Sequence, residues 1–441
     1  MFRSDDPGSL RRGRFLYFPA VPGRLEFATA VRRLILAERP DVVAVELPVT
    51  LQAAYRRSLE RLPQLSVIVY EDEQEDSAVY VPVEITDPFV EALRTAQEVG
   101  AATAFVDPDI RERPHLDEDY PDTYAVQRIG LEKYVQTWRF HRPGRASGAE
   151  GFAGAIAWKL QGLDPTARVL VVVSLNLLDA VMEAMERPQA QPLRRVRRQG
   201  VRVLNLHPEC LAEVLTEFPC LQETYEAQRP AAAGCEVQAA DSLDRQKLHF
   251  QLFAAAQREY EKNTGERLAH WQRRLWSRYA RNLAFTQREL VAGLFDLIVA
   301  ARSIADDNFA WELWELANRF RHQKTASDLM TVAISGDQMW EKTRRILLRR
   351  RLPRRKARPR PIGLRGRKKE AFPGQWDQAS SNRWSICSYP PEDLVIENYG
   401  DFLKKKGKSI LSEERVRTEP FMTSLLDGID LRETIRNWHE R

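Results

Sequence analysis

Short apolar runs alternate with helical patterns through the first half of the chain, up to about residue 230. Phe27, Val31, Leu34 and Ile35 recur at the spacing of one helix face. The runs between such helices are continuously apolar, as in strands that lie inside a sheet rather than at its edge. They are Phe15–Phe18, Val42–Val45, Ser66–Tyr70, Ala102–Val106, Val169–Val173 and Val201–Leu204. This alternation predicts an α/β domain with a largely parallel sheet and flanking helices.

From about residue 241 to residue 352 the pattern changes to long helices rich in Trp, Leu and Arg. Trp271, Leu275, Tyr279 and Leu283 recur on one helix face. A second stripe consists of Leu290, Leu294, Leu297, Ile298 and Ala301, and Trp311 and Trp314 extend it. Aromatic stripes at helical spacing are most often core, so we expect these side chains to be buried in a helical domain.

The pattern divides the chain into four segments. Residues 1–230 are expected to form the α/β domain and residues 231–352 the helical domain. Residues 353–385 are a basic linker, in which prolines among the arginines exclude a continuous helix. Residues 386–441 form a small C-terminal segment that is short for a core of its own. This segment either docks on the helical domain or belongs to a longer domain.

Composition and charge narrow the classes of protein. The 441 residues are 43% hydrophobic, which is enough for packed cores. The 67 basic residues are nearly balanced by 62 acidic ones, so the net charge of +5 gives no overall nucleic-acid footprint. The four cysteines lack the close paired spacing of a zinc site. No apolar run reaches membrane-spanning length, so a cytoplasmic location without membrane contact is the default expectation.

Basic residues are concentrated in one tract. Residues 344–369 hold fourteen Lys and Arg side chains, enough for sequence-independent contact with phosphates. The candidate nucleic-acid or anion-binding residues are Arg349, Arg350, Arg351, Arg354, Arg355, Lys356, Arg367, Lys368 and Lys369. The tract contains no aromatic residue that could stack on bases. A solvated linker, or a contact with an acidic surface, explains the same tract.

Acidic residues and one histidine follow several of the predicted strands. Ligands of parallel sheets gather beyond the carboxyl ends of the strands, where loops converge and helix N-termini point inward. The candidate catalytic residues are Glu46, Glu84, Asp107, Asp109 and His207. Such a cluster could hold a hard divalent cation, or act as a general acid and base with separated pKa values.

Structural explanations compete with these catalytic ones. Asp87, which stands before a proline, has the form of a helix N-cap. Asp107 and Asp109 fit a strand-end turn, and His207 before a proline is typical of a capping residue. Glu46 is different, because a carboxylate directly after Val-Val-Ala-Val is costly to bury without a partner.

The surroundings of Glu46 resemble a known family. The run Pro40-Asp41-Val42-Val43-Ala44-Val45-Glu46-Leu47, followed later by Ala101-Ala102-Thr103-Ala104-Phe105-Val106-Asp107, is similar to the TraB/PrgY-type family. That family is related to Tiki-type proteases, ChaN-like heme-binding proteins and erythromycin esterases. The resemblance covers about residues 14–210 and implies a bacterial α/β protein. It also implies that Glu46 corresponds to the acidic site residue of the family.

The chain departs from the enzymatic members of this family at two histidine motifs. Those members carry Gly-X-X-His after the first strand and again after a later strand. Here the two sites read Pro19-Ala20-Val21-Pro22 and Ser174-Leu175-Asn176-Leu177. An open catalytic metal site needs about three protein donors, so the loss of both imidazoles argues against the metal chemistry of the family.

Three functions follow from these patterns. The first is a non-catalytic member of the family that binds a ligand or partner at the strand-end crevice, with a protein contact or homo-oligomer formed through the helical domain. The second is a divergent hydrolase that uses the carboxylates around Glu46, with a divalent metal. The third is sequence-independent nucleic-acid binding through residues 344–369. We favour the first, which needs no cofactor, because Glu46 is retained without the histidines.

Overall fold

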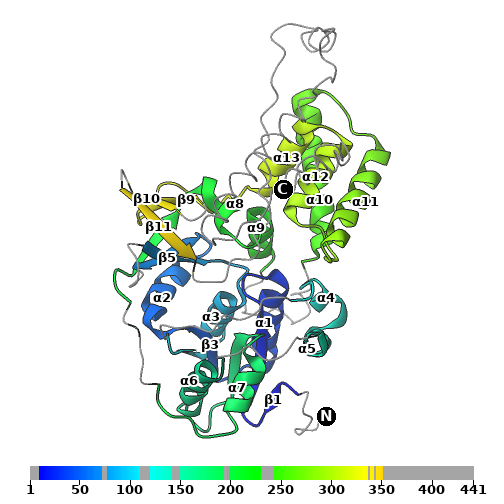
Figure 1. Ribbon diagram of the computed structural model, residues 1–441. Coiled ribbons are helices and arrows are strands. Elements are labelled where there is room, and N and C mark those ends of the chain that lie inside the picture. The colour runs from blue at the N-terminus through cyan, green and yellow to red at the C-terminus, as the bar shows by residue number, and fades with distance from the viewer. Residues whose placement is uncertain are drawn as a thin grey trace, which may run out of the picture. The chain divides into compact units, whose positions relative to one another are not determined.

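The computed structural model describes residues 9–71, 77–109, 120–141, 149–192, 196, 198–229, 243–335, 338–341 and 344–350. Two β-sheets with flanking helices, and a group of helices that precedes the last three strands of the second sheet, build this part of the chain (Figure 1). The α/β architecture predicted from the alternation of apolar runs is therefore confirmed.

The first sheet has the strand order β1-β2-β7-β3-β6. Its strands are β1 (Arg11–Arg12), β2 (Phe15–Ala20), β7 (Val169–Ser174), β3 (Val42–Pro48) and β6 (Ala102–Asp107). All neighbours pair in parallel except β1 with β2. The central strand β7 is buried along its whole length, which explains why its sequence is an uninterrupted apolar run. The parallel arrangement brings the carboxyl ends of β2, β7, β3 and β6 to one edge.

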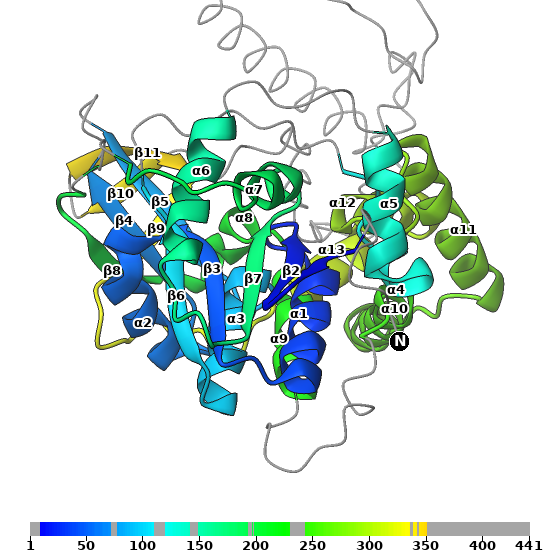
Figure 2. The ribbon, with the colours of Figure 1, turned by 90° about the horizontal axis from the view of Figure 1, so that it is seen from below.

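Helices cover both faces of the first sheet (Figures 1 and 2). Helices α1 (Leu25–Glu38) and α3 (Pro88–Val99) lie on one face. Helices α6 (Ala149–Gln161) and α7 (Leu178–Ala184) lie on the other. The predicted stripe on α1 is confirmed for Phe27, Val31 and Ile35, which are fully buried.

The N-cap prediction for α3 is confirmed. The Asp87 side chain accepts hydrogen bonds from the backbone N–H groups of Phe89 and Val90, at 2.9 and 3.1 Å. Pro88 occupies the first helical turn, where its missing N–H is not needed. Gly100 ends the helix in the left-handed conformation, with φ of 74°.

The second sheet contains strands that the sequence analysis placed in a single parallel sheet. Its order is β10-β11-β5-β4-β8-β9, and the pairing closes on itself. The strands are β4 (Ser66–Glu71), β5 (Ser77–Val83), β8 (Arg202–Leu206), β9 (Thr331–Ser335), β10 (Gln338–Glu341) and β11 (Arg344–Arg350). Strand β4 is antiparallel to both β5 and β8. The expectation of one largely parallel sheet is therefore wrong for β4 and β8. An apolar run indicates that a strand is buried, but not which strand it pairs with or in which direction.

Two further expectations differ from the structure. Strand β6 lies at an edge of the first sheet, and Ala102 at its start is exposed, although its run suggested an interior strand. The described residues between Thr331 and Arg350 lie in strands rather than continuing the predicted helical pattern to residue 352. Strand β9 pairs with β8 and β11 pairs with β5, so this segment completes the second sheet. A strand that is stabilised by pairing with distant segments leaves little signal in its own local sequence.

Shorter helices connect and flank the sheets. They are η1 (Val49–Leu51), α2 (Gln52–Arg61), α4 (Ala125–Ile129), α5 (Leu131–His141), η2 (Pro208–Cys210), α8 (Leu211–Val214) and α9 (Pro219–Gln228). Buried ion pairs fix several helices to one another. Arg229, which follows α9, and Arg32 of α1 both contact the fully buried Glu91 of α3, at 3.1 and 3.3 Å. The carboxylate therefore has two positive partners in place of water.

The helical group consists of α10 (Arg245–Thr264), α11 (His270–Thr286), α12 (Leu294–Ile304) and α13 (Asp307–Ala317). Its core is aromatic. The Phe253 ring lies 4.6 Å from the Trp276 ring and 5.0 Å from the Phe309 ring, measured between centroids. The indole N–H of Trp276 donates to the backbone oxygen of Leu297 at 3.0 Å, so the buried polar atom is satisfied. Among the helices that the structure describes, none is long and apolar enough to cross a membrane.

The predicted core stripe of α11 is wrong. Trp271, Leu275 and Tyr279 are 61%, 41% and 36% exposed, respectively. The core face of α11 instead consists of Trp276, Ala280 and Ala284. Both sets have the same i, i+4, i+8 spacing, so periodicity alone does not show which of the two is buried. The two alanines let α11 approach its neighbours closely, which side chains as large as Leu or Tyr would prevent. Leu290 of the second stripe is also exposed, whereas Leu297, Ile298 and Ala301 are buried as expected.

Candidate functional site

The carboxyl-end edge of the first sheet holds Glu46, the residue that carries the family resemblance. Its side chain is 2% exposed. One carboxylate oxygen accepts a hydrogen bond of 2.6 Å from the backbone N–H of Ser174, the last residue of β7. Glu46 therefore links β3 to its neighbour β7 just beyond the last paired residues of the two strands.

Asp107 and Asp109 lie at the same edge and form a turn. The Asp107 carboxylate accepts from the backbone N–H of Asp109 at 2.7 Å. Asp109 is fully buried and has a positive φ of 53°, a conformation that Asp tolerates better than most residues. Its carboxylate pairs with Arg198 at 2.7 Å and accepts a hydrogen bond from the Thr50 hydroxyl. Both carboxylates thus hold the chain after β6 in place, as the strand-end turn interpretation expected.

Glu84 and His207 belong to the second sheet. Glu84 follows β5 and accepts from the backbone N–H and hydroxyl of Thr216, at 2.8 and 2.9 Å, and from the Gln222 amide at 3.0 Å. His207 follows β8, and its Nδ1 accepts from the backbone N–H of Glu209 at 3.3 Å. His207 is thus the N-cap of η2, as the capping interpretation expected.

The five predicted catalytic residues therefore divide between the two sheets. Within the part of the chain that the structure describes, no three His, Cys, Asp or Glu side chains are grouped so that they could hold a metal ion. Glu46, Asp107 and Asp109 lie at the carboxyl ends of strands of the first sheet, whereas Glu84 and His207 follow strands of the second sheet and hold other segments. Of the basic tract, Arg349 and Arg350 belong to β11. The remaining candidates, Arg351, Arg354, Arg355, Lys356, Arg367, Lys368 and Lys369, lie outside the described residues.

A buried ion cluster was not anticipated from the sequence. Arg245, the first residue of α10, contacts Glu26 of α1 and Glu217, which precedes α9. Nitrogen–oxygen distances in these two pairs include 3.0 Å to Glu26 and 2.8 Å to Glu217. Arg24 lies 3.7 Å from Glu217 on the other side. No local motif joins positions this far apart in the chain, so only the tertiary structure brings them together.

The electrostatics of this cluster depend on Arg245. Burial by itself would raise the pKa of Glu217, but the guanidinium of Arg245 outweighs burial and holds that pKa below its ordinary value. The two carboxylates in turn raise the pKa of Arg245, against the effect of burial. Arg245 and Glu217 are thus both charged at neutral pH, and the contact between Arg245 and Glu26 ties the start of α10 to α1.

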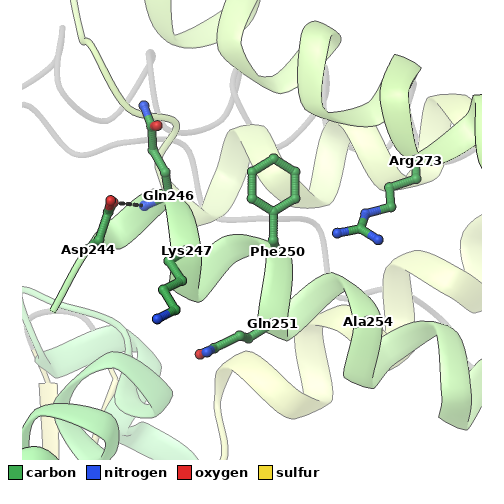
Figure 3. Close-up of a pocket in the computed structure, with 7 residues that line it drawn as sticks. All are labelled: Asp244, Gln246, Lys247, Phe250, Gln251, Ala254 and Arg273. Atoms are coloured by element: carbon green, nitrogen blue, oxygen red, sulfur yellow. Dashed lines mark hydrogen bonds between the residues drawn. The ribbon is translucent and has the colours of Figure 1, made fainter.

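An open pocket lies between α10 and α11 (Figure 3). It has a volume of about 510 Å³ and is lined by Asp244, Gln246, Lys247, Phe250, Gln251, Ala254 and Arg273. The guanidinium carbon of Arg273 lies 5.5 Å from the centre of the Phe250 ring. Two cations beside an aromatic ring match a ligand that carries an anionic group on a planar ring, because the cations attract the charge and the aromatic side chain stacks on the ring.

The outer side of α11 carries a second unusual surface, which we call the α11 face. It consists of Trp271, Arg274, Leu275, Arg278, Tyr279 and Arg281, all exposed. In both ribbon views α11 lies at the margin of the helical group, with α10 and α12 toward its inner side (Figures 1 and 2). Exposed aromatic and aliphatic side chains gathered on one helix indicate an interaction site more than scattered ones do.

Comparison of the chain with protein-family models, with curated proteins and with solved structures gave no match. The resemblance to the TraB/PrgY-type family therefore stays a prediction that rests on the short motifs around Glu46 and Asp107.

Proposed function

We propose that this chain is a non-catalytic binding protein that diverged from the TraB/PrgY-type family. Its α/β part serves as a scaffold, and its partner binds at the exposed surface of the helical group. This moves the binding surface away from the strand-end crevice that the sequence favoured. The proposal is supported by how the acidic residues at the strand ends are used and by the exposed side chains of α11.

One observation carries the proposal: the strand-end carboxylates are engaged by groups of the fold itself. Glu46 accepts from a backbone N–H of the adjacent strand, and Asp109 pairs with Arg198. Glu84 accepts from three donors. A general base must instead be able to reach a proton of the substrate, and a metal ligand must direct its oxygen at the ion. The contacts of these carboxylates therefore favour a role in stabilising the fold over a role in catalysis or metal binding.

The test compares Glu46→Gln with Glu84→Gln. Both substitutions remove a buried carboxylate but keep an acceptor oxygen for the neighbouring donors, so both variants should fold. Metal content and hydrolysis of ester, amide and phosphodiester substrates are measured for the wild type and for each variant. We expect no stoichiometric metal, no hydrolysis that depends on Glu46, and similar small decreases in Tm for the two variants.

Glu84→Gln is the matched control because Glu84 is equally buried but lies in the other sheet. Hydrolysis by the wild type that is lost in Glu46→Gln and kept in Glu84→Gln would overturn the proposal. Such a result would establish the divergent hydrolase instead, and stoichiometric metal alongside it would identify its cofactor.

A further inference from the structure

The arginines of the α11 face have no carboxylate partner among the described residues. Helix α11 contains four arginines and no Asp or Glu. Within the residues that the structure describes, none of Arg274, Arg278 and Arg281 forms an ion pair. Elsewhere in the same part of the chain many arginines are paired, for example Arg94 with Glu226 and Arg139 with Asp179. The α11 face is therefore a concentrated positive surface whose charge is not neutralised by any carboxylate in the described part of the chain.

The apolar side chains and the arginines form two rows that lie side by side at the start of this face and diverge toward its end, because Arg281 lies about 160° around the helix from Tyr279. Trp271, Leu275 and Tyr279 recur every four residues, and Arg274, Arg278 and Arg281 follow three or two residues after them. At 1.5 Å of rise per residue, the arginines are spaced about 4.5–6 Å apart along the helix axis. The two aromatic rings of the apolar row are separated by about 12 Å along the same axis.

We propose that the α11 face binds single-stranded nucleic acid. The arginine row contacts successive phosphates of the strand, and Trp271 and Tyr279 stack on its bases. Guanidinium groups match phosphate geometry and also tolerate stacking, which makes arginine suited to this role. Aromatic rings beside such a row accept any base, because every base has a π-face. This inference rests on the proposed function, since it names the partner of a protein that acts by binding.

Features of the surface favour a single strand over a duplex. The bases of a duplex are already stacked on one another, so they cannot cover exposed Trp and Tyr rings. Arg273, next to Arg274, reaches the α10/α11 pocket, where Lys247 adds a second cation. Adjacent residues of a helix point in different directions, so Arg273 and this pocket, with the Phe250 ring, lie on the side of α11 that faces α10 and are separate from the α11 face (Figure 3).

The test is fluorescence anisotropy of the full chain with labelled 20-nucleotide oligo(dT) and oligo(U) at several salt concentrations. The variant Arg274→Gln/Arg278→Gln/Arg281→Gln removes three phosphate contacts. We expect it to weaken binding at least tenfold at low salt, and to reduce the slope of log K against log salt by about 2. Trp271→Ala should weaken binding about fivefold or more while leaving the salt slope unchanged, because it removes stacking but no charge.

The matched control is Arg12→Gln/Arg56→Gln/Arg57→Gln, which removes the same charge from exposed positions of β1 and α2. It should bind oligonucleotides as the wild type does. Equal binding by the wild type and the α11 triple variant would overturn the proposal, as would equal losses in the two triple variants. Retention of polyglutamate or of phosphatidylglycerol vesicles, but not of oligonucleotides, would also overturn it by identifying an acidic protein or a membrane as the partner. None of these outcomes involves hydrolysis, so failure here is distinct from failure of the non-catalytic proposal.

Discussion

Replacing Arg245 with methionine should strongly destabilise the protein. The substitution keeps most of the side-chain volume but removes the positive charge that faces Glu26 and Glu217. The Glu26 side chain is fully buried and that of Glu217 is 4% exposed, so neither carboxylate can recover its hydration. Removing one partner of a buried ion pair costs about 3–5 kcal/mol.

The lower part of that range applies here. Arg24 remains 3.7 Å from Glu217 and continues to compensate its charge. Glu26 keeps a 3.3 Å hydrogen bond from the Thr123 hydroxyl. We therefore expect a loss of about 3 kcal/mol at pH 7.5. Urea denaturation followed by far-UV circular dichroism measures it, with Arg267→Met as the control, because Arg267 pairs with Glu261 at the surface.

The pH dependence of this loss provides a second test. In the wild type, Arg245 holds the pKa of Glu217 below its ordinary value, so the stability from this pairing is present above the unfolded pKa. It is lost only as pH falls through the lower folded pKa. In Arg245→Met, the burial of Glu217 is offset by Arg24 but no longer by the Arg245 guanidinium, so the folded pKa of Glu217 rises and protonation of this carboxylate stabilises the folded state. The difference between variant and wild type should therefore narrow from pH 7.5 to pH 5.5. A loss below about 1 kcal/mol, or one equal to that of Arg267→Met, would refute the reasoning.

Three further substitutions test the packing, the backbone and the pH response. Phe253→Ala should cost about 3–5 kcal/mol in chemical denaturation because its ring is in the aromatic core, whereas Phe285→Ala, at a side chain 77% exposed, should leave stability almost unchanged. Gly23→Ala should lower Tm more than Gly100→Ala: both have positive φ, but a Cβ at Gly23 would lie 2.6 Å from a neighbouring hydroxyl and one at Gly100 meets open space. Burial, with a smaller contribution from the adjacent guanidinium, lowers the pKa of His249 to about 3. Between about pH 6.5 and pH 3 the folded state thus binds one proton fewer than the unfolded state. As pH is lowered through this range, the free energy of unfolding of the wild type should decrease relative to that of His249→Phe, by up to about 1.4 kcal/mol per pH unit. An unchanged pH slope in His249→Phe would contradict the assigned protonation.

The positions of secondary structure followed from local patterns. The predicted strands at Phe15–Phe18, Val42–Val45 and Val169–Val173 are present as β2, β3 and β7. The same is true of the buried face of α1 and of the Asp87 cap of α3. Each of these features depends on residues within one or two turns or strand lengths, so the sequence contains the whole signal.

The candidate site was only partly predictable. Glu46, Asp107 and Asp109 do share the carboxyl-end edge of one sheet, as the rule for parallel strands implied. Glu84 and His207 instead follow β5 and β8, which belong to a different sheet whose antiparallel pairing the apolar runs could not encode. The partners of the carboxylates, such as Arg198 for Asp109, come from distant segments. Their function in the fold was therefore invisible in the sequence.

Local patterns in the sequence determined strands such as β2, β3 and β7 and the helices α1 and α3, because periodicity and capping act over a few residues, but they did not reveal the strands between Thr331 and Arg350. The tertiary structure decided which strands share a sheet, which carboxylates have partners, and which side of α11 faces solvent. Helix α11 presents two stripes of equal spacing, and the sequence favoured the one with larger side chains. The buried stripe is the other one, Trp276, Ala280 and Ala284, because close packing of helices depends on the shape and total volume of the side chains and not on hydrophobicity alone. Trp271, Leu275 and Tyr279 were thereby left exposed beside arginines that have no ion pair with any described residue, a surface that follows from helix packing and not from the helical periodicity itself.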